Sequence, residues 1–128
     1  MNRIIITAGT VVLEAELNDS PTARQIWQAL PIEGRANRWG DEIYFEIPVI
    51  AAEEPTARVD VEVGELGYWP VGHAFCIFFG PTPVSTGQAP RAYSPVNIVG
   101  RVAGDATRLR TVQDGTAVRL ERAASAAR

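Results

Sequence analysis

The first forty residues alternate between apolar and polar positions in a way that predicts a hairpin followed by one helix. Residues 3–8 form a β-branched run, Gly9-Thr10 is a turn pair, and residues 11–17 resume the alternation. Asn18, Asp19 and Ser20 then offer N-cap side chains, Pro21 takes the favoured first helical position, and apolar residues recur at helical spacing up to Pro31. These apolar residues are Ala23, Ile26, Trp27 and Leu30.

A second hairpin is predicted around the turn pair Gly40-Asp41. In residues 42–47 every second side chain is apolar, so we expect Ile43, Phe45 and Ile47 to face inward. The residues between them, Glu42, Tyr44 and Glu46, are expected to face outward. This strand should therefore have one face in the core and one in solvent.

The middle of the chain predicts three more strands. Valines alternate with acidic residues in 59–63, and residues 67–70 lead through a tight corner into residues 74–79. The last of these segments is apolar on both faces, which favours a central strand with the core on one side and a covering helix on the other.

The prolines in residues 81–95 predict a long loop, and loops of that length are often functional. A strand over residues 96–103, a short helix capped by Asp105, and a strand over residues 116–121 complete the pattern. The total is about eight strands and two helices, for which an antiparallel barrel is the economical arrangement because closure removes exposed strand edges. We expect residues 1–122 to form a single domain and residues 123–128 a flexible tail.

Composition narrows the possible functions. The 128 residues include 46% hydrophobic and 21% charged side chains, which is typical of a folded globular domain. The net charge is -3, and the basic residues, all arginines, are scattered among acids, which argues against nucleic-acid binding. No apolar segment is long enough for a signal peptide or a membrane span, and a single cysteine fits a reducing compartment, so we expect a cytoplasmic protein without a disulfide.

Four motifs carry a resemblance to a known family: W-G-D-E-I-Y-F at 39–45, V-G-E-L-G-Y-W-P-V-G at 63–72, F-F-G-P-T-P at 78–83 and V-N-I-V-G at 96–100. In order and spacing the chain resembles a small prokaryotic cyclophilin-like family. The resemblance implies a mainly β fold, a closed eight-stranded antiparallel barrel with about two capping helices. It supplies no catalytic residues, because the F-H-R and Q-G-G-D segments of true prolyl isomerases are absent.

Prolyl isomerisation remains one hypothesis for the activity of such a chain. The reaction needs a guanidinium that donates toward the prolyl nitrogen beside an apolar slot, to lower an amide rotation barrier of about 18–20 kcal/mol. Arg58 is a weak candidate for this catalytic role. A nucleophilic His73–Cys76 pair is less favoured, because side chains three residues apart on a strand face opposite sides. The lone histidine predicts no metal site, and nothing in the sequence indicates a cofactor.

The hypothesis we favour is a noncatalytic module that binds a proline-containing peptide or a small apolar ligand. Its candidate ligand-binding residues are Tyr44, Tyr68, Trp69, Phe79 and Thr82. Tyr68 and Trp69 are neighbours in an extended segment, so we expect one ring in the core and the other beside a groove. A divergent prolyl isomerase is the alternative, a small enzyme of other chemistry is a third reading, and the oligomeric state stays open.

Overall fold

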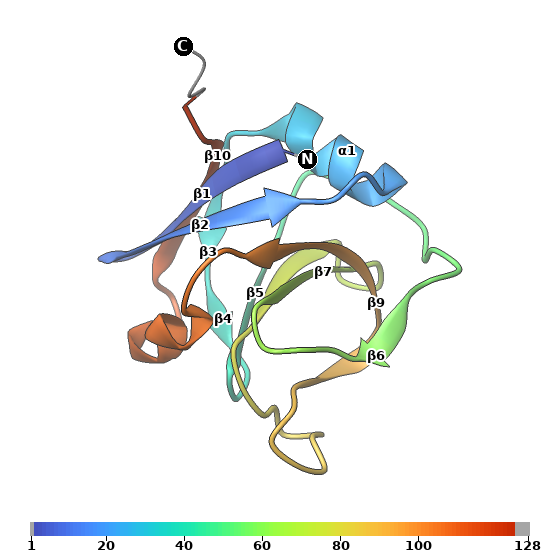
Figure 1. Cartoon of the computed structure of the whole chain (residues 1–128), viewed down its shortest axis with the longest axis vertical. Helices are drawn as coiled ribbons and strands as arrows, with labels where there is room; N and C mark the ends of the chain where they lie inside the picture. The colour runs from blue at the N-terminus through green and yellow to red at the C-terminus, as the bar shows by residue number, and fades with distance from the viewer. Residues whose placement is uncertain (1, 125–128) are drawn as a thin grey trace.

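The computed structural model describes residues 2–124, which form antiparallel strands with one helix at each of two ends (Figure 1). The first strands and the helix are β1 (Asn2–Ala8), β2 (Val11–Leu17), α1 (Pro21–Ala29), β3 (Ile32–Arg35), β4 (Asn37–Arg38) and β5 (Glu42–Glu46). The remaining elements are β6 (Arg58–Asp60), β7 (Glu65–Trp69), β8 (Ala74–Phe78), β9 (Arg91–Val102), the 3₁₀ helix η1 (Ala106–Thr111) and β10 (Ala117–Arg122). Most of the predicted tail, from residue 125 onward, lies outside the described residues.

The strands form a curved sheet in the order β3-β10-β1-β2-β9-β7-β8-β5-β4, and β6 pairs with β9 beside this path. The mainly β, antiparallel class predicted from the sequence is confirmed, with ten strands in the described residues rather than eight. Within residues 2–124 hydrogen bonds do not close the sheet into a ring, since β3 and β4 are its two ends.

A change of partner at Ala36 explains one of the additional strands. Residues 32–39, the arm that precedes Gly40-Asp41 in the predicted second hairpin, pair with β10 through β3 and with β5 through β4. Between them the Ala36 N–H donates to the carbonyl of Thr116 at 2.8 Å, and its carbonyl accepts from Gly115 at 2.7 Å. Because the backbone of Ala36 bonds to a turn, the strand is interrupted there.

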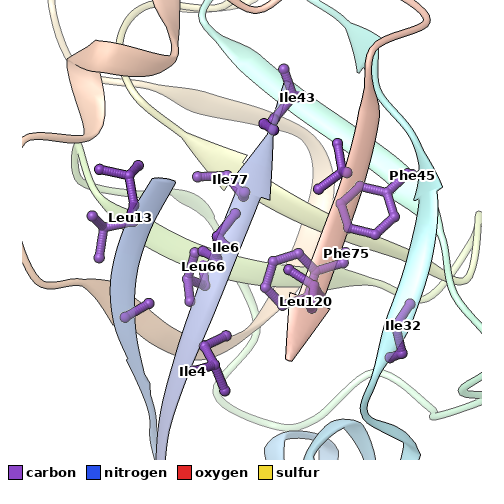
Figure 2. Packing of buried hydrophobic residues seen from close by; sticks show 14 of the residues in the cluster. Ile4, Ile6, Leu13, Ile32, Ile43, Phe45, Leu66, Phe75, Ile77 and Leu120 are labelled. Carbon is purple, nitrogen blue, oxygen red and sulfur yellow. The ribbon is translucent and has the colours of Figure 1, made fainter. Parts of the chain in front are cut away.

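The main core is an apolar cluster that includes the side chains predicted to face inward on β5, and Figure 2 shows part of it. Among its largest members are Ile4, Ile6, Leu13, Ile43, Phe45, Leu66, Phe75, Ile77 and Leu120. Helix α1 adds Ile26, and η1 adds Leu109. Each fully buried side chain of this size stabilises the fold by about 1.5–3 kcal/mol through removal of apolar surface from water.

Helix α1 is capped by Ser20, one of the three candidate capping residues, and η1 is capped by Asp105 as predicted. The Ser20 hydroxyl accepts from the Ala23 N–H at 3.2 Å, with Pro21 at the first helical position of α1. The Asp105 carboxylate accepts from the Thr107 N–H at 3.0 Å at the start of η1.

A second apolar cluster lies on the opposite face of β8, where the sequence predicted a covering helix. That prediction is wrong: the cluster is formed with the residue directly after β6 and with the first half of β9, and its members are Val61, Cys76, Phe78, Ala92 and Val96. Trp69, Tyr44 and Ile98 pack against it while remaining partly exposed. The sheet therefore has buried side chains on both faces at this point.

The predicted loop over residues 81–95 ends earlier than expected, because β9 begins at Arg91 and includes Pro95. Arg58 pairs with Val96 and Asp60 pairs with Arg91. Residues 58–60 of β6 therefore lie opposite the longer segment 91–96 of β9. The additional residues of β9 form a bulge, and a bulge tolerates a proline that has no N–H to donate.

Candidate ligand-binding pocket

A pocket of about 170 Å³ opens on the face of the sheet that carries the second cluster. It is lined by Trp39, Glu42, Tyr44, Trp69, Cys76, Ala92, Tyr93 and Val96. These residues come from the turn before β5 and from β5, β7, β8 and β9, which are distant in sequence. The β9 bulge supplies Tyr93 and Ala92, so the irregular pairing with β6 helps to build the pocket wall.

Four aromatic rings form a continuous series around the pocket. Ring centroids lie 6.1 Å apart for Trp39 and Tyr93, 6.1 Å for Tyr93 and Trp69, and 6.2 Å for Trp69 and Tyr44. Each pair meets at 77° or 85°, the edge-to-face arrangement that the ring quadrupoles favour. The Trp69 indole N–H donates to the Ser94 hydroxyl at 2.6 Å, which fixes the orientation of this ring. Tyr93 is 72% exposed and lies at the rim.

Glu42 is the acidic group of the pocket. The residue is only 5% exposed, and burial raises the pKa of its carboxyl to about 7, although a hydrogen bond with Cys76 acts in the opposite direction. Among residues 2–124 no arginine or histidine forms an ion pair with it. Near neutral pH this carboxyl is therefore poised between its protonated and ionised forms.

Cys76 contacts the same carboxyl from the neighbouring strand β8. Burial, together with the charge of Glu42, raises the pKa of its thiol well above the usual value, so the group remains protonated. His73 lies in the turn before β8 at a φ of 50°, and it is not among the residues that line the pocket. The acidic neighbour of Cys76 disfavours the thiolate that a nucleophile requires.

Two of the five candidate ligand-binding residues, Tyr44 and Trp69, line this pocket. Tyr68 faces the other side of β7, where it is fully buried in the main core and donates its hydroxyl to the Val49 carbonyl at 2.6 Å. Phe79 is also buried, with the Arg38 guanidinium 5.0 Å from its ring centroid. Thr82 donates its hydroxyl to the Arg91 carbonyl at 2.5 Å and thereby ties the 79–90 loop to β9.

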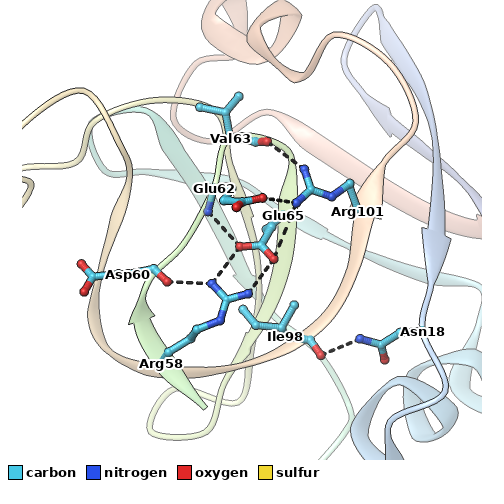
Figure 3. A network of polar contacts seen from close by, with 8 residues as sticks. All are labelled: Asn18, Arg58, Asp60, Glu62, Val63, Glu65, Ile98 and Arg101. Atoms are coloured by element: carbon cyan, nitrogen blue, oxygen red, sulfur yellow. Dashed lines mark hydrogen bonds and ion pairs between the residues drawn. The ribbon is translucent and has the colours of Figure 1, made fainter. Parts of the chain in front are cut away.

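Arg58, the weak catalytic candidate, lies outside the pocket lining in an ion-pair network (Figure 3). Its guanidinium donates to both carboxylate oxygens of Glu65, at 2.9 and 2.8 Å. Burial alone would raise the pKa of Glu65, but the hydrogen bonds from Arg58 and from the Glu62 backbone, with the charge of Arg101, hold it below its usual value. Figure 3 shows Arg101 on the other side of the same carboxylate.

Sequence reasoning missed Glu42, which was expected to face solvent. Its side chain does point away from the main core, but the second cluster and the aromatic rings cover it. The same reasoning missed Trp39 and Tyr93, since each lies beside a turn or bulge rather than within a regular alternation. One signal was present: the apolar segment at β8 indicated a second buried layer next to β5.

Two further findings concern the described residues only. Residues 2–124 contain no group of three or more histidine, cysteine, aspartate or glutamate side chains placed to hold a metal ion. No helix in that range has the length and apolar character needed to cross a membrane.

Comparisons with known proteins identify relatives of the whole fold. A family model described as cyclophilin-like matches residues 2–121. The solution structure of the hypothetical protein AF2241 from Archaeoglobus fulgidus is 42% identical, with 95% of each chain covered and a TM-score of 0.81. The structure of McbB in complex with tryptophan shares the fold at 18% identity and a TM-score of 0.71, covering 98% of this chain and 46% of that one. No curated protein sequence matches the chain.

Proposed function

Because the chain belongs to the cyclophilin-like family, in which the related AF2241 is a hypothetical protein, we propose a function from the pocket itself. The protein is a noncatalytic binding module whose aromatic pocket takes a small ligand or one residue of a proline-containing peptide. The observation that carries this proposal is the series of four edge-to-face rings around one solvent-accessible hollow. Aromatic rings with one polar edge are typical of such sites.

The size of the pocket limits what it can accept. Pockets for drug-sized ligands measure about 300–1,000 Å³, and this one measures about 170 Å³. A single proline ring, an indole or a small headgroup is therefore a better match than an extended ligand buried along its whole length.

The alternative, a divergent prolyl isomerase, receives less support from the geometry. Its mechanism needs a guanidinium directed into the aromatic pocket, and neither Arg58 nor Arg38 lines it. Arg58 is held by Glu65, while Arg38 donates to Asp41 at 3.1 Å and to the Val112 carbonyl at 2.7 Å. Releasing either arginine would break several hydrogen bonds to charged or buried acceptors.

A second part of the proposal concerns how the barrel of this cyclophilin-like domain is closed. The two ends of the sheet, β3 and β4, are consecutive in sequence and joined through Ala36. We infer that this continuity of the chain, rather than a ladder of hydrogen bonds, closes the barrel. Closure of this kind would hold in place the paired strands β5 and β8, which carry pocket residues.

The three tryptophans provide a direct test by ¹H–¹⁵N spectra of their indole groups. The probes are indole, L-tryptophan, which is the ligand seen with McbB, and a short Ala-Ala-Pro-Phe peptide. We expect at least one probe to shift the signals of Trp39 and Trp69. The signal of Trp27, which lies on α1 with the Arg122 guanidinium over its ring, should stay unchanged.

A variant pair controls for nonspecific effects. Tyr93→Ala should weaken the shifts, whereas Val71→Ala, which alters a side chain of similar exposure outside the pocket, should not. The same peptide in a protease-coupled assay should isomerise at its uncatalysed rate. Strong acceleration that Arg58→Ala abolishes would replace this proposal with the isomerase alternative.

A further inference from the structure

We propose that the ligand of this pocket is an organic cation with a methylated ammonium group, enclosed by the four rings and paired with Glu42. The inference rests on the proposed binding function and adds to it the charge of the ligand. It follows from an imbalance of charge inside the pocket.

Two glutamates are equally buried, and of these two only Glu65 has a cationic partner among the described residues. Glu42 and Glu65 are each 5% exposed. Arg58 and Arg101 neutralise Glu65, but within residues 2–124 no cationic side chain pairs with Glu42. Buried carboxylates are normally paired, because an isolated charge loses its hydration without compensation. Glu42 therefore lacks a cationic partner where the aromatic pocket opens to solvent.

The aromatic side chains of the pocket, like Glu42, favour a cationic ligand. Trp39, Tyr44, Trp69 and Tyr93 surround a space beside the carboxylate. The face of an aromatic ring attracts a cation within about 6 Å of its centroid, and tryptophan and tyrosine are the strongest of the aromatic side chains in this respect. Several rings at steep angles to one another present faces and edges from different directions, as an enclosing cage requires.

The scarcity of acceptors selects among cations. A free ammonium carries three N–H donors and a guanidinium carries five, and each needs acceptors when it is buried. Apart from Glu42 the side-chain oxygens of the lining are the two hydroxyls of Tyr44 and Tyr93, and the other lining residues are two tryptophans, a thiol, Ala92 and Val96. A trimethylammonium group has no N–H donors to satisfy, and its compact shape fits a pocket of about 170 Å³.

Binding of such a cation should depend on pH, because the ionised form of Glu42 is the competent one. The titratable groups that face it are Cys76 on β8, Tyr44 on β5 and Tyr93 on β9, and the adjacent Asp41 is paired with Arg38. Since burial raises the pKa of Glu42 to about 7, affinity should rise as pH increases through 7 and level off above it. The ionised fraction predicts binding about a hundredfold weaker at pH 5 than at pH 8.

The experiment compares choline chloride with 3,3-dimethylbutan-1-ol, in which a neutral carbon replaces the charged nitrogen of choline. Binding is measured by the indole shifts of Trp39 and Trp69 at constant ionic strength. We expect choline to bind at least about tenfold more tightly than the alcohol. Glu42→Gln should remove this preference and the pH dependence, and Glu46→Gln, on the exposed part of the same strand, should preserve both.

Each other outcome has a defined meaning. Equal binding of choline and the alcohol, or choline binding that Glu42→Gln leaves unchanged, would overturn the cationic ligand while the binding function stands. The same conclusion follows if indole shifts Trp39 and Trp69 but choline does not. If no probe moves either signal, the proposed function fails as well. Should Glu42→Gln not fold, Tyr93→Ala supplies the second variant, since this exposed ring should be needed for choline and not for stability.

Discussion

Replacing Glu42 by glutamine should make the protein more stable at neutral and alkaline pH. Burial raises the pKa of the Glu42 carboxyl from 4.5 to about 7, so between these values the folded state holds a proton that the unfolded state has released. Stability must then fall as pH rises through this window, and above it the full penalty applies. At 1.36 kcal/mol for each pKa unit, the penalty is about 3 kcal/mol. Glutamine has nearly the same shape and stays neutral, so the variant escapes this cost.

Urea unfolding followed by tryptophan fluorescence tests the size and the sign of this effect. At pH 4 the Glu42 carboxyl is protonated in the folded protein and mostly protonated in the unfolded chain. Glu42→Gln and the parent should therefore unfold at similar urea concentrations. At pH 8 the free energy of unfolding of the variant should be about 2–3 kcal/mol higher. Glu46→Gln, at an exposed site on the same strand, should follow the parent at both values. A Glu42→Gln variant that loses stability at pH 8, or that parallels the parent throughout, would refute the reasoning.

Three further predictions concern packing. Gly100→Ala should cost about 3 kcal/mol in urea unfolding, because the added Cβ would lie 2.1 Å from the Glu16 carbonyl oxygen; an unchanged midpoint would contradict this close approach. Tyr68→Phe should cost about 1–3 kcal/mol by the same measurement, since the buried Val49 carbonyl loses its donor, and a neutral effect would show that this bond is dispensable. Cys76 should react with a thiol reagent in urea and not in the native protein, and rapid native labelling would disprove its burial.

Local pattern predicted those parts of the structure that local chemistry determines. The inward side chains of β5, the cap of α1 at Ser20 and the corner between β7 and β8 follow from alternation, capping and turn residues. The opposite placement of Tyr68 and Trp69 follows from the two-residue period of a strand.

The features that local pattern did not predict depend on contacts between distant segments. Ala36 interrupts a strand because its backbone bonds to residues 115 and 116, some eighty positions away. Glu42 lies in a pocket whose other lining residues include Trp69 from β7 and Ala92 from β9, and nothing in residues 42–47 indicates these distant neighbours. Three of the eight lining residues, Ala92, Tyr93 and Val96, therefore come from a distant strand whose irregular pairing only the folded chain reveals.

The most direct test of the account is the location of bound choline, measured through nuclear Overhauser contacts between its methyl protons and aromatic ring protons. We predict contacts to the rings of Trp39, Tyr44, Trp69 and Tyr93 in one bound position. Contacts confined to Trp27, or none to any of the four rings at saturating choline, would contradict the claim that this pocket is a cation-binding site.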